Sequence, residues 1–501
     1  MPTLSARSAQ TLLALGMLAL SSAGAQSRAT TGAATSVRTA KLEWTAPIGT
    51  GQLVRDLGGI LDASVGSGDW GVIVVSRTRG DTLFHRNADV QLVPASTMKV
   101  FTAAMALELL GPEHRFETTV LREGPVSSGI LSGNLVFRGG GDPAFGTKAG
   151  DAPLRQLAQQ VRDRGITRVT GSVIGDGSSF DGRLVPEGWL PRWLQASYAT
   201  RVSANSYSQN LVAVRVAPVK GSTRASVTIT PSLEGLPVTN AVTVRAGSRS
   251  AAITVRQDPK TGAFRIGGWI GALSAARSYS YVVENPDLFV AAAFTAALRE
   301  AGVTVDLPVI ARHAGADAVP VATLASAPVS ELITTMTGSS NNHFAELIFR
   351  NAARAAGGAG SADTGNALLR SFLTDRVGTA ATSVYAADGS GLSTHDRVTP
   401  RSLVGVLDYS ARADWGPVLA SALPVAGRTE TLKTRMRGTP ADGKLRAKTG
   451  TTSEVTSLSG YVTAANGEEL VFAFIYNGSD RFRAREAIDA MGSTLASFTR
   501  F

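Results

Sequence analysis

Residues 93–101 of the chain read VPASTMKVF and place Ser96 three residues before Lys99. Pro94 precedes an apolar pattern of helical spacing that runs to Leu109, so we expect the two residues to open a helix. Because positions i and i+3 share one face of a helix, an uncharged lysine there can accept the proton of the serine hydroxyl. The positive end of the helix dipole also favours negative charge on the serine. The spacing thus predicts a nucleophile and its base.

Lysine is scarce in this chain, so the position of each lysine is informative. Only 8 of the 49 basic residues are lysine, and Lys99 alone has a serine three residues before it. Taken by itself, the spacing also fits a solvated serine and an exposed lysine at the start of a helix. The neighbouring Val93, Met98 and Phe101 favour a buried setting instead.

A second lysine lies in the tripeptide Lys448-Thr449-Gly450. At the edge of a strand this tripeptide can line a cleft and receive a substrate carboxylate, and its glycine permits close approach of the backbone. An ordinary exposed turn is the alternative. The same tripeptide occurs at Lys260-Thr261-Gly262, where the preceding Asp258-Pro259 predicts a hairpin turn.

Residues 340–342 read Ser-Asn-Asn and precede an expected helix at 343–356. A serine two residues before an asparagine is weak on its own, because the pattern also fits helix capping. The same pattern occurs at four other places, which are 132–134, 203–205, 208–210 and 339–341. The position of the 340–342 copy between Ser96 and Lys448, on a loop that enters a helix, selects it from the others.

In this order, the three motifs resemble the set of penicillin-binding proteins and serine β-lactamases. The chain is identified as a member of the class C low-molecular-mass penicillin-binding proteins, the D-alanyl-D-alanine carboxypeptidase/endopeptidase family. Further stretches support the resemblance, namely Gly141-Asp142-Pro143, Gly175-Asp176 and 388–393 (DGSGLS). The resemblance implies an α/β (α+β) fold, with a catalytic domain like that of β-lactamases and DD-peptidases. In such a domain an antiparallel sheet is flanked by helices, and β-rich domains are inserted into it.

The resemblance also implies a role for each motif residue. Ser96 attacks the D-Ala-D-Ala carbonyl and forms an acyl-enzyme, and Lys99 is the general base. Ser340 passes a proton to the leaving amine, and Asn342 binds the substrate backbone. Lys448 supplies positive potential.

Four further residues are implied to contact the substrate. Thr449 helps to hold the terminal carboxylate, and Gly450 lets the backbone approach it closely. The backbone N–H groups of Ser96 and Thr451 form an oxyanion hole. Asp176 resembles an acidic residue that binds the amine of the stem-peptide diamino acid, and a turn-capping aspartate is the alternative for it.

Two positions depart from the family pattern. Asp396, shortly after the DGSGLS stretch, stands where we expect an asparagine. Asn341 stands where the motif has an aspartate. Neither departure removes a catalytic group, but both concern local contacts with the substrate.

The distance between the motifs predicts the domain organisation. Ser96 and Ser340 lie 244 positions apart, far more than a plain β-lactamase-like domain requires, and short β-rich pieces fill the interval. We therefore expect a signal peptide at 1–25, a linker at 26–37, a catalytic domain formed by 38–108 and 319–501, an inserted domain II formed by 109–224 and 286–318, and a β-rich inserted domain III at 225–285.

The first residues predict export. Residues 11–20 form a largely apolar run that is too short to cross a bilayer, and Ala23-Gly24-Ala25 fits a cleavage site. A buried N-terminal helix is the alternative, but a polar stretch follows at 26–40. With no cysteine in the chain, lipidation is excluded. We expect a protein that is secreted across the inner membrane to the periplasm or cell envelope.

Composition excludes several other classes. An apolar share of 44% and a charged share of 18% exclude a disordered chain, and the absence of cysteine excludes thiol chemistry. The five histidines have no metal-ligand spacing, so we predict no metal or cofactor, and we expect His343 at the surface. The net charge of +10 has no basic cluster with interleaved aromatics, which argues against nucleic acid and favours peripheral association with a membrane or the wall.

Three functions compete for these observations. The first is a serine-type carboxypeptidase/endopeptidase that acts on peptidoglycan stem peptides and is inhibited covalently by β-lactam antibiotics. The second is a serine β-lactamase, against which the long insert and the lack of a deacylating glutamate argue. The third is a non-catalytic wall-binding homologue, against which the intact Ser96, Lys99 and Lys448 argue.

Overall fold

The computed structural model describes residues 42–147 and 150–501. The expected signal peptide and linker lie outside the described residues. Helices and sheets alternate along the chain, and the fold is a mixed α/β fold. Within the described ranges, no helix is long and apolar enough to cross a membrane.

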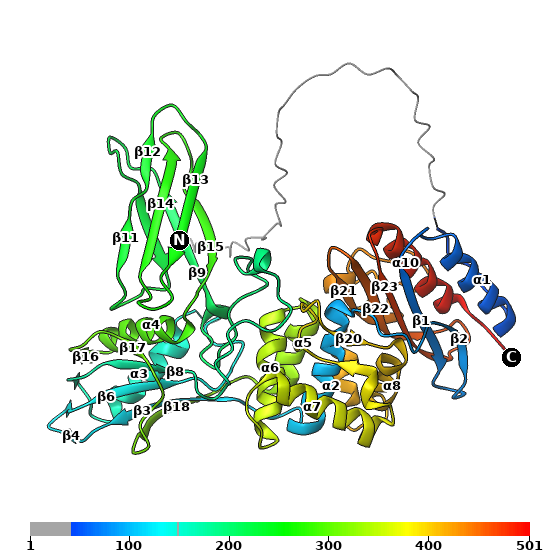
Figure 1. Ribbon diagram of the computed structural model, residues 1–501, viewed down its shortest axis with the longest axis horizontal. Coiled ribbons are helices and arrows are strands. Elements are labelled where there is room, and N and C mark those ends of the chain that lie inside the picture. Colours follow the sequence, from blue (N-terminus) through cyan, green and yellow to red (C-terminus); the bar gives the residue numbers. More distant parts are fainter. Residues whose placement is uncertain (1–41, 148–149) are drawn as a thin grey trace, which may run out of the picture. The chain divides into compact units, whose positions relative to one another are not determined.

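A five-stranded antiparallel sheet joins the two ends of the chain (Figure 1). The strand order is β2-β1-β23-β22-β21, with bounds β1 (Asp69–Ser76), β2 (Thr82–Arg86), β21 (Leu445–Thr451), β22 (Val455–Thr463) and β23 (Glu469–Asn477). β1 pairs with β23 along its whole length, from Asp69 opposite Asn477 to Ser76 opposite Leu470. β1 and β2 form an antiparallel hairpin.

Helices cover both faces of this sheet. One face carries α1 (Thr50–Asp62) and α10 (Arg481–Ser497). The other face carries a layer of α2 (Met98–Leu110), α5 (Val329–Gly338), α6 (Asn342–Ala355), α7 (Ala362–Phe372), α8 (Pro400–Ser410) and α9 (Gly416–Ala422). The sequence pattern predicted one apolar face for α2. The structure instead buries every residue from Met98 to Leu107, because the other helices and the sheet surround this helix.

The chain between α2 and α5 first forms a mixed sheet of strand order β17-β8-β6-β3-β18. Its strands are β3 (Glu117–Glu123), β6 (Asn134–Arg138), β8 (Val173–Asp176), β17 (Ile310–Ala311) and β18 (Val319–Ala325). A small sheet adjoins it, formed by β4 (Val126–Ser127), β5 (Ile130–Leu131), β7 (Arg168–Val169) and β16 (Thr304–Val305). The helices α3 (Ala152–Asp163) and α4 (Pro286–Glu300) share its core. The pairing of β18 with β3 makes residues 319–325 part of this sheet.

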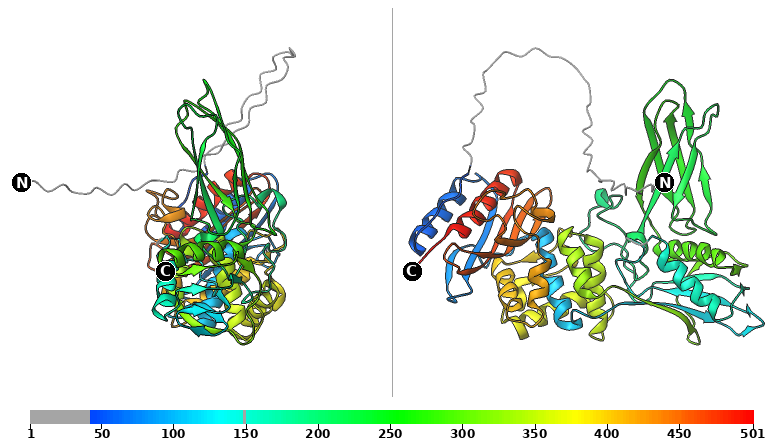
Figure 2. Two further views of the ribbon diagram at one scale, coloured as in Figure 1. Left: turned by 90° about the vertical axis from the view of Figure 1, so that its left-hand side faces the viewer. Right: turned by 180° about the vertical axis from the view of Figure 1, so that it is seen from behind.

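Two further sheets pack on each other within the insert, as Figures 1 and 2 show. One sheet has the order β10-β9-β15, with β9 (Leu211–Ala217), β10 (Ser226–Thr230) and β15 (Arg277–Val282). In the other sheet β14 (Phe264–Gly271) pairs with β11 (Val238–Asn240), β12 (Thr243–Arg245) and β13 (Ala251–Gln257). β9 is the central strand of the first sheet, so we describe residues 211–283 together as the β unit. The last pair is β19 (Val384–Tyr385) with β20 (Arg397–Val398).

Candidate active site

Ser96 and Lys99 meet at the start of α2. Ser96 lies in a single 3-10 turn, Ala95–Thr97, directly before the helix. Nζ of Lys99 lies 3.0 Å from Oγ of Ser96 and 2.6 Å from the carbonyl oxygen of Ser390. Oδ1 of Asn342 accepts a third hydrogen bond from this amine, over 2.7 Å. The structure therefore brings together the predicted serine–lysine pair and holds the amine with three acceptors.

Burial lowers the pKa of Lys99 to about 8, although the carboxylates of Asp388 and Glu346 attract its charge and raise the pKa. At pH 7 such a group is uncharged in about a tenth of the molecules, far more often than an ordinary lysine. An amine with a pKa near the working pH is suited to accept a proton from a hydroxyl. The environment of Lys99 therefore fits a general base.

Asp388 shapes the loop that presents a carbonyl to Lys99. Its Oδ1 accepts the backbone N–H groups of Ser390 (2.9 Å) and Gly391 (2.6 Å). Its Oδ2 accepts the indole N–H of Trp189, which belongs to the insert, over 2.7 Å. The carboxylate is completely buried and acts as the acceptor that closes this loop.

Asp396 is also completely buried. Its Oδ1 accepts the backbone N–H groups of Ala387 (2.9 Å) and Asp388 (3.2 Å), whereas its Oδ2 has no partner among the described residues. Burial, and after it the charge of Asp388, raises the pKa of Asp396 well above the usual range. Burial and the nearby charge of Asp388 both favour the protonated, neutral form of Asp396.

Ser340 and Lys448 form the second pair of the site. Nζ of Lys448 lies 2.8 Å from Oγ of Ser340 and 2.9 Å from the carbonyl oxygen of Thr449. Lys448 is completely buried; burial first, and then the positive charge of Lys99, lower its pKa well below the ordinary value. Ser340 lies two residues before Asn342, which contacts Lys99, so the two amines lie at one site.

The loop that presents Ser340 has an uncommon backbone. Ser340 has a φ of 57°, a left-handed conformation that non-glycine residues adopt rarely. The next residue, Asn341, caps α6 by accepting the N–H of Phe344 (3.1 Å), and its amide donates to Gln209 over 2.7 Å. Asn341, which departs from the family motif, therefore anchors this loop and does not point its amide at Ser96 or Lys99.

Gly450 lets β21 approach the turn that carries Ser96. A Cβ at this position would lie 2.1 Å from Oγ of Ser457, 2.7 Å from the carbonyl oxygen of Pro94 and 3.1 Å from the backbone nitrogen of Ser96. No side chain fits there. The other copy of the tripeptide, at 260–262, lies in the turn between β13 and β14, as predicted.

Thr449 and Thr451 continue β21 past Lys448. The hydroxyl of Thr449 donates to Oγ1 of Thr431 over 3.1 Å, and Thr451 is exposed at the end of the strand. Both threonines therefore lie within two residues of Gly450 and its contact with the serine turn.

Asp176 is not brought to this site. Its carboxylate is completely buried and accepts bonds from Nε of Arg138 (2.9 Å) and the backbone N–H groups of Ser178 (3.0 Å) and Ala314 (3.1 Å). All of these partners belong to the insert, and the bond to Ser178 is a turn-capping contact. The structure thus matches the turn-capping alternative and gives no support to a contact between Asp176 and substrate.

Segment 177–210 of the insert contacts Asn342 and His343. Neither of the two serine–asparagine patterns in this segment was selected from the sequence. Nδ2 of Asn342 donates to the carbonyl oxygen of Tyr198 over 2.9 Å. His343 is 4% exposed, and its ring nitrogens contact the hydroxyls of Thr200 (2.9 Å) and Ser206 (2.8 Å). The prediction that His343 lies at the surface was wrong, because this segment covers it. The only signal in the sequence for a role of His343 was that it directly follows the Ser-Asn-Asn motif at 340–342.

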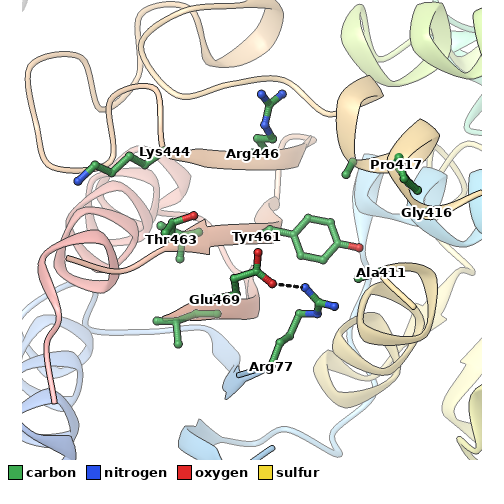
Figure 3. Close-up of a pocket in the computed structure, with 12 residues that line it drawn as sticks. Arg77, Ala411, Gly416, Pro417, Lys444, Arg446, Tyr461, Thr463 and Glu469 are labelled. Carbon is green, nitrogen blue, oxygen red and sulfur yellow. Dashed lines mark hydrogen bonds and ion pairs between the residues drawn. The ribbon is translucent and has the colours of Figure 1, made fainter. Parts of the chain in front are cut away.

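A cavity of about 330 Å³ is lined in part by residues of β21, β22 and β23 (Figure 3). The ion pair of Arg77 with Glu469, at 2.6 Å, lines one side, and the ring of Tyr461 lines another. Arg446 contributes from β21, two residues before Lys448. None of the motif residues lines it, so we assign it no role in the reaction. Among the residues described, no cluster of side chains is suited to hold a metal ion.

Comparison with known proteins identifies the family. Residues 58–498 match the model of the D-Ala-D-Ala carboxypeptidase 3 (S13) family. The chain belongs to this family. A D-alanyl-D-alanine carboxypeptidase of Actinomadura sp. (strain R39) is 32% identical over 464 residues, which cover 89% of this chain and 85% of the relative. The predicted resemblance is thereby confirmed.

Further comparisons extend this result to the fold. The D-alanyl-D-alanine carboxypeptidase DacB of Haemophilus influenzae is 27% identical, over 81% of this chain and 85% of the relative. The crystal structure of penicillin binding protein 4 (dacB) from Haemophilus influenzae matches with a TM-score of 0.74 and 25% identity, over 86% of this chain and 98% of that chain. The predicted fold class and the predicted enzyme class, a serine-type D-Ala-D-Ala carboxypeptidase, are confirmed.

Proposed function

We propose that this S13-family enzyme removes the terminal D-alanine from peptidoglycan stem peptides through an acyl-enzyme on Ser96, and that it also cleaves cross-linked stem peptides. The observation that carries the proposal is the hydrogen-bonded pair of Ser96 and Lys99, with Ser340 and Lys448 in the same site. Family membership supports the reaction class.

In the proposed acylation, uncharged Lys99 takes the proton of the Ser96 hydroxyl while Oγ attacks the carbonyl carbon of the penultimate D-alanine. A C–O bond forms, and the π electrons of the carbonyl move onto its oxygen. The backbone N–H groups of Ser96 and Thr451 stabilise this oxyanion. The low pKa of Lys99, caused by burial, supports its role as base.

The intermediate then collapses. The C–N bond breaks, and the hydroxyl of Ser340 passes a proton to the nitrogen of the leaving D-alanine. The proton removed from Ser96 ends on this amine through the network of Lys99, Ser340 and Lys448, so that Lys99 is uncharged again. Water then attacks the ester carbon, Ser96 regains its proton, and the shortened peptide leaves.

Recognition of the substrate uses the same residues. Lys448 and Thr449 receive the terminal carboxylate, and Asn342 binds the peptide backbone. Burial lowers the pKa of Lys448, whereas a carboxylate bound beside it raises that pKa again, because an opposite charge favours the ammonium form. A bound carboxylate therefore favours the ammonium form of Lys448.

β-Lactam antibiotics fit the proposal as covalent inhibitors that acylate Ser96. A crystal structure of penicillin binding protein 4 from Haemophilus influenzae in complex with a β-lactam supports this. We also propose export to the periplasm or cell envelope, which the pattern of residues 1–25 supports. The domain organisation that we propose has one catalytic domain, interrupted between α2 and α5 by domain II and the β unit 211–283.

The test uses purified muropeptides. A monomeric pentapeptide should lose one D-alanine, and a cross-linked dimer should yield monomers, both measured by mass analysis of the products. Fluorescent penicillin should label the protein, and Ser96→Ala should abolish labelling and hydrolysis together. Ser132→Ala, in another serine–asparagine pattern, is the matched control. Absence of labelling of the intact protein, or turnover of penicillin many times per second, would contradict the proposal.

A further inference from the structure

The β unit 211–283 carries most of the net positive charge of the chain. It contains nine basic and two acidic residues, so its net charge is +7 out of +10 for all 501 residues. All nine basic side chains are exposed, namely Arg215, Lys220, Arg224, Arg245, Arg249, Arg256, Lys260, Arg265 and Arg277. A charge this concentrated on one part of a protein marks a surface for a negatively charged partner.

None of the nine basic residues forms an ion pair within the ranges 42–147 and 150–501. The acidic residues of the unit are used elsewhere. Glu234 pairs with Arg299 of α4 at 2.7 Å, and Asp258 accepts the backbone N–H groups of the β13–β14 turn. The charge of the unit is therefore left uncompensated by the protein itself.

Two of these cations lie directly opposite each other. Arg256 of β13 pairs in register with Arg265 of β14, and both are exposed on the outer face of the sheet. Like charges in this relationship destabilise a sheet. On the other side of β14, Arg265 is opposite Thr239, and neither arginine has an ion-pair partner among the described residues. An anion bound between the two guanidinium groups would relieve the repulsion.

An aromatic ring lies farther along the same face. Trp269 follows Arg265 by four positions, about 13 Å along β14, and the guanidinium carbon of Arg245 lies 4.2 Å from the centroid of its ring. Between Arg265 and Trp269 the strand carries Gly267, above which only the hydroxyl of Thr254 comes close. We call this surface, formed by Arg245, Arg256, Arg265 and Trp269, the arginine face.

A cavity adjoins the arginine face. It has a volume of about 530 Å³ and is lined mainly by residues of the edge strands β13 and β15, including Arg256 and Tyr281. Glu284 also lines it, and its carboxylate pairs with Arg201 at 2.5 Å. Edge strands offer unpaired backbone groups to a partner. A partner on the arginine face thus has a recess beside Arg256 into which a branch can extend.

We propose that the arginine face binds the carboxylate-bearing glycan polymer of the cell wall, peptidoglycan, at a distance from the catalytic serine. The carboxylates of its peptides match the unpaired arginines, which bind such groups through two parallel hydrogen bonds. Its sugar rings match the ring of Trp269 and the hydroxyls around it. The choice of this polymer rests on the proposed function, whereas the charge and the half-buried ring of Trp269 are independent of it.

The test is co-sedimentation of the purified full-length chain with peptidoglycan sacculi from which phosphate polymers have been removed. The wild type should sediment, and binding should weaken as salt rises, because exposed charges are screened. The double variant Arg256→Gln/Arg265→Gln should bind at least about fivefold more weakly. The matched control is Arg155→Gln/Arg164→Gln, which removes two exposed cations of the α3 region that form no ion pair and should sediment like the wild type.

The outcomes separate the proposal from the catalytic function. Hydrolysis of a soluble D-Ala-D-Ala tripeptide should be equal in the wild type and in both double variants, and circular dichroism should show that all three fold. Equal sedimentation of wild type and Arg256→Gln/Arg265→Gln would overturn the proposal, as would equal losses in the control variant. Stronger binding to anionic lipid vesicles, or to phosphate polymers, than to sacculi would overturn it too. Sedimentation without hydrolysis would instead contradict only the proposed function.

Discussion

Nζ of Lys448 donates a hydrogen bond to Oγ of Ser340 over 2.8 Å, although the two residues lie 108 positions apart in the chain. This hydrogen bond connects strand β21 to the loop before α6. Lys448 is completely buried and Ser340 is half-buried, so this is not a contact between two surface side chains.

The lysine of this pair gives the first prediction. Lys448→Ala should lower kcat/KM for a D-Ala-D-Ala peptide by about 10²- to 10³-fold, as expected when a group that stabilises developing charge is removed. Lys260→Ala, in the other copy of the tripeptide, should leave the rate unchanged, since Lys260 lies in an exposed hairpin turn. Steady-state kinetics of the two variants decides the matter, and the reverse pattern would show that the wrong tripeptide had been assigned.

Gly450 gives a second prediction. Gly450→Ala should lower the rate of acylation by at least about tenfold, because the new Cβ would press on the carbonyl of Pro94 and displace the serine turn. In Gly58→Ala, where a Cβ meets no atom within 4 Å and the helix gains a better helix former, stability should rise by about 0.5–1 kcal/mol with activity unchanged. Labelling rates with fluorescent penicillin and thermal melts measure both effects. Normal acylation in Gly450→Ala would contradict the close contact.

The pKa of Lys99 predicts the pH dependence of acylation. Because the uncharged amine is the base, kcat/KM should rise with pH and level off above the pKa of about 8 that burial gives this lysine. A pH profile of penicillin labelling, with protein stability checked at each pH, tests this. A flat profile between pH 6 and pH 10 would rule out Lys99 as the titrating base.

Asp396 predicts a substitution that is silent for activity. Asp396→Asn should keep kcat within about twofold, because a neutral amide replaces the carboxyl and its oxygen can still accept the N–H groups of Ala387 and Asp388. Asp388→Asn should lose most activity, since its oxygen atoms accept the N–H bonds of the loop beside Lys99.

Asp396→Asn should also change how the stability of the protein depends on pH. The pKa of Asp396 is raised in the folded protein, so the folded state binds this proton more tightly, and stability is lost as pH rises from the unfolded pKa toward the folded one. The asparagine does not titrate. The Tm difference between Asp396→Asn and the wild type should therefore increase from pH 5 to pH 8, and a constant difference would contradict a neutral Asp396.

The motifs were predictable from the sequence because each acts over a few neighbouring residues. Ser96 with Lys99, and Lys448 with Gly450, have spacings that carry chemical meaning before the fold is known, and the structure places them together. Their catalytic roles stay predictions that the experiments above test. The long interval between Ser96 and Ser340 also indicated that further domains are inserted there.

Residues that depend on distant packing could not be predicted in the same way. His343 was expected at the surface, since nothing near it in the sequence tells that segment 177–210 covers it. Asp176 was chosen by resemblance, but the partners that bury it come from residues 138 and 314, far away in the chain. The β unit 211–283 was placed approximately, because the start of its central strand β9 is decided by pairing with β15, some 65 residues later.

His343 makes the last prediction, which concerns the contact between insert and catalytic domain. Burial lowers its pKa to about 3, so the folded protein holds the neutral imidazole between Thr200 and Ser206. The stability from this group is complete above the unfolded pKa of about 6.5 and is lost as pH falls toward 3, by up to about 1.4 kcal/mol per pH unit. His343→Gln keeps hydrogen-bonding groups without a proton to gain, so its Tm should fall less than that of the wild type between pH 6.5 and pH 4. His85→Gln, at an exposed histidine, should follow the wild type. Parallel curves for His343→Gln and the wild type would show that this buried imidazole does not link acid stability to the interface.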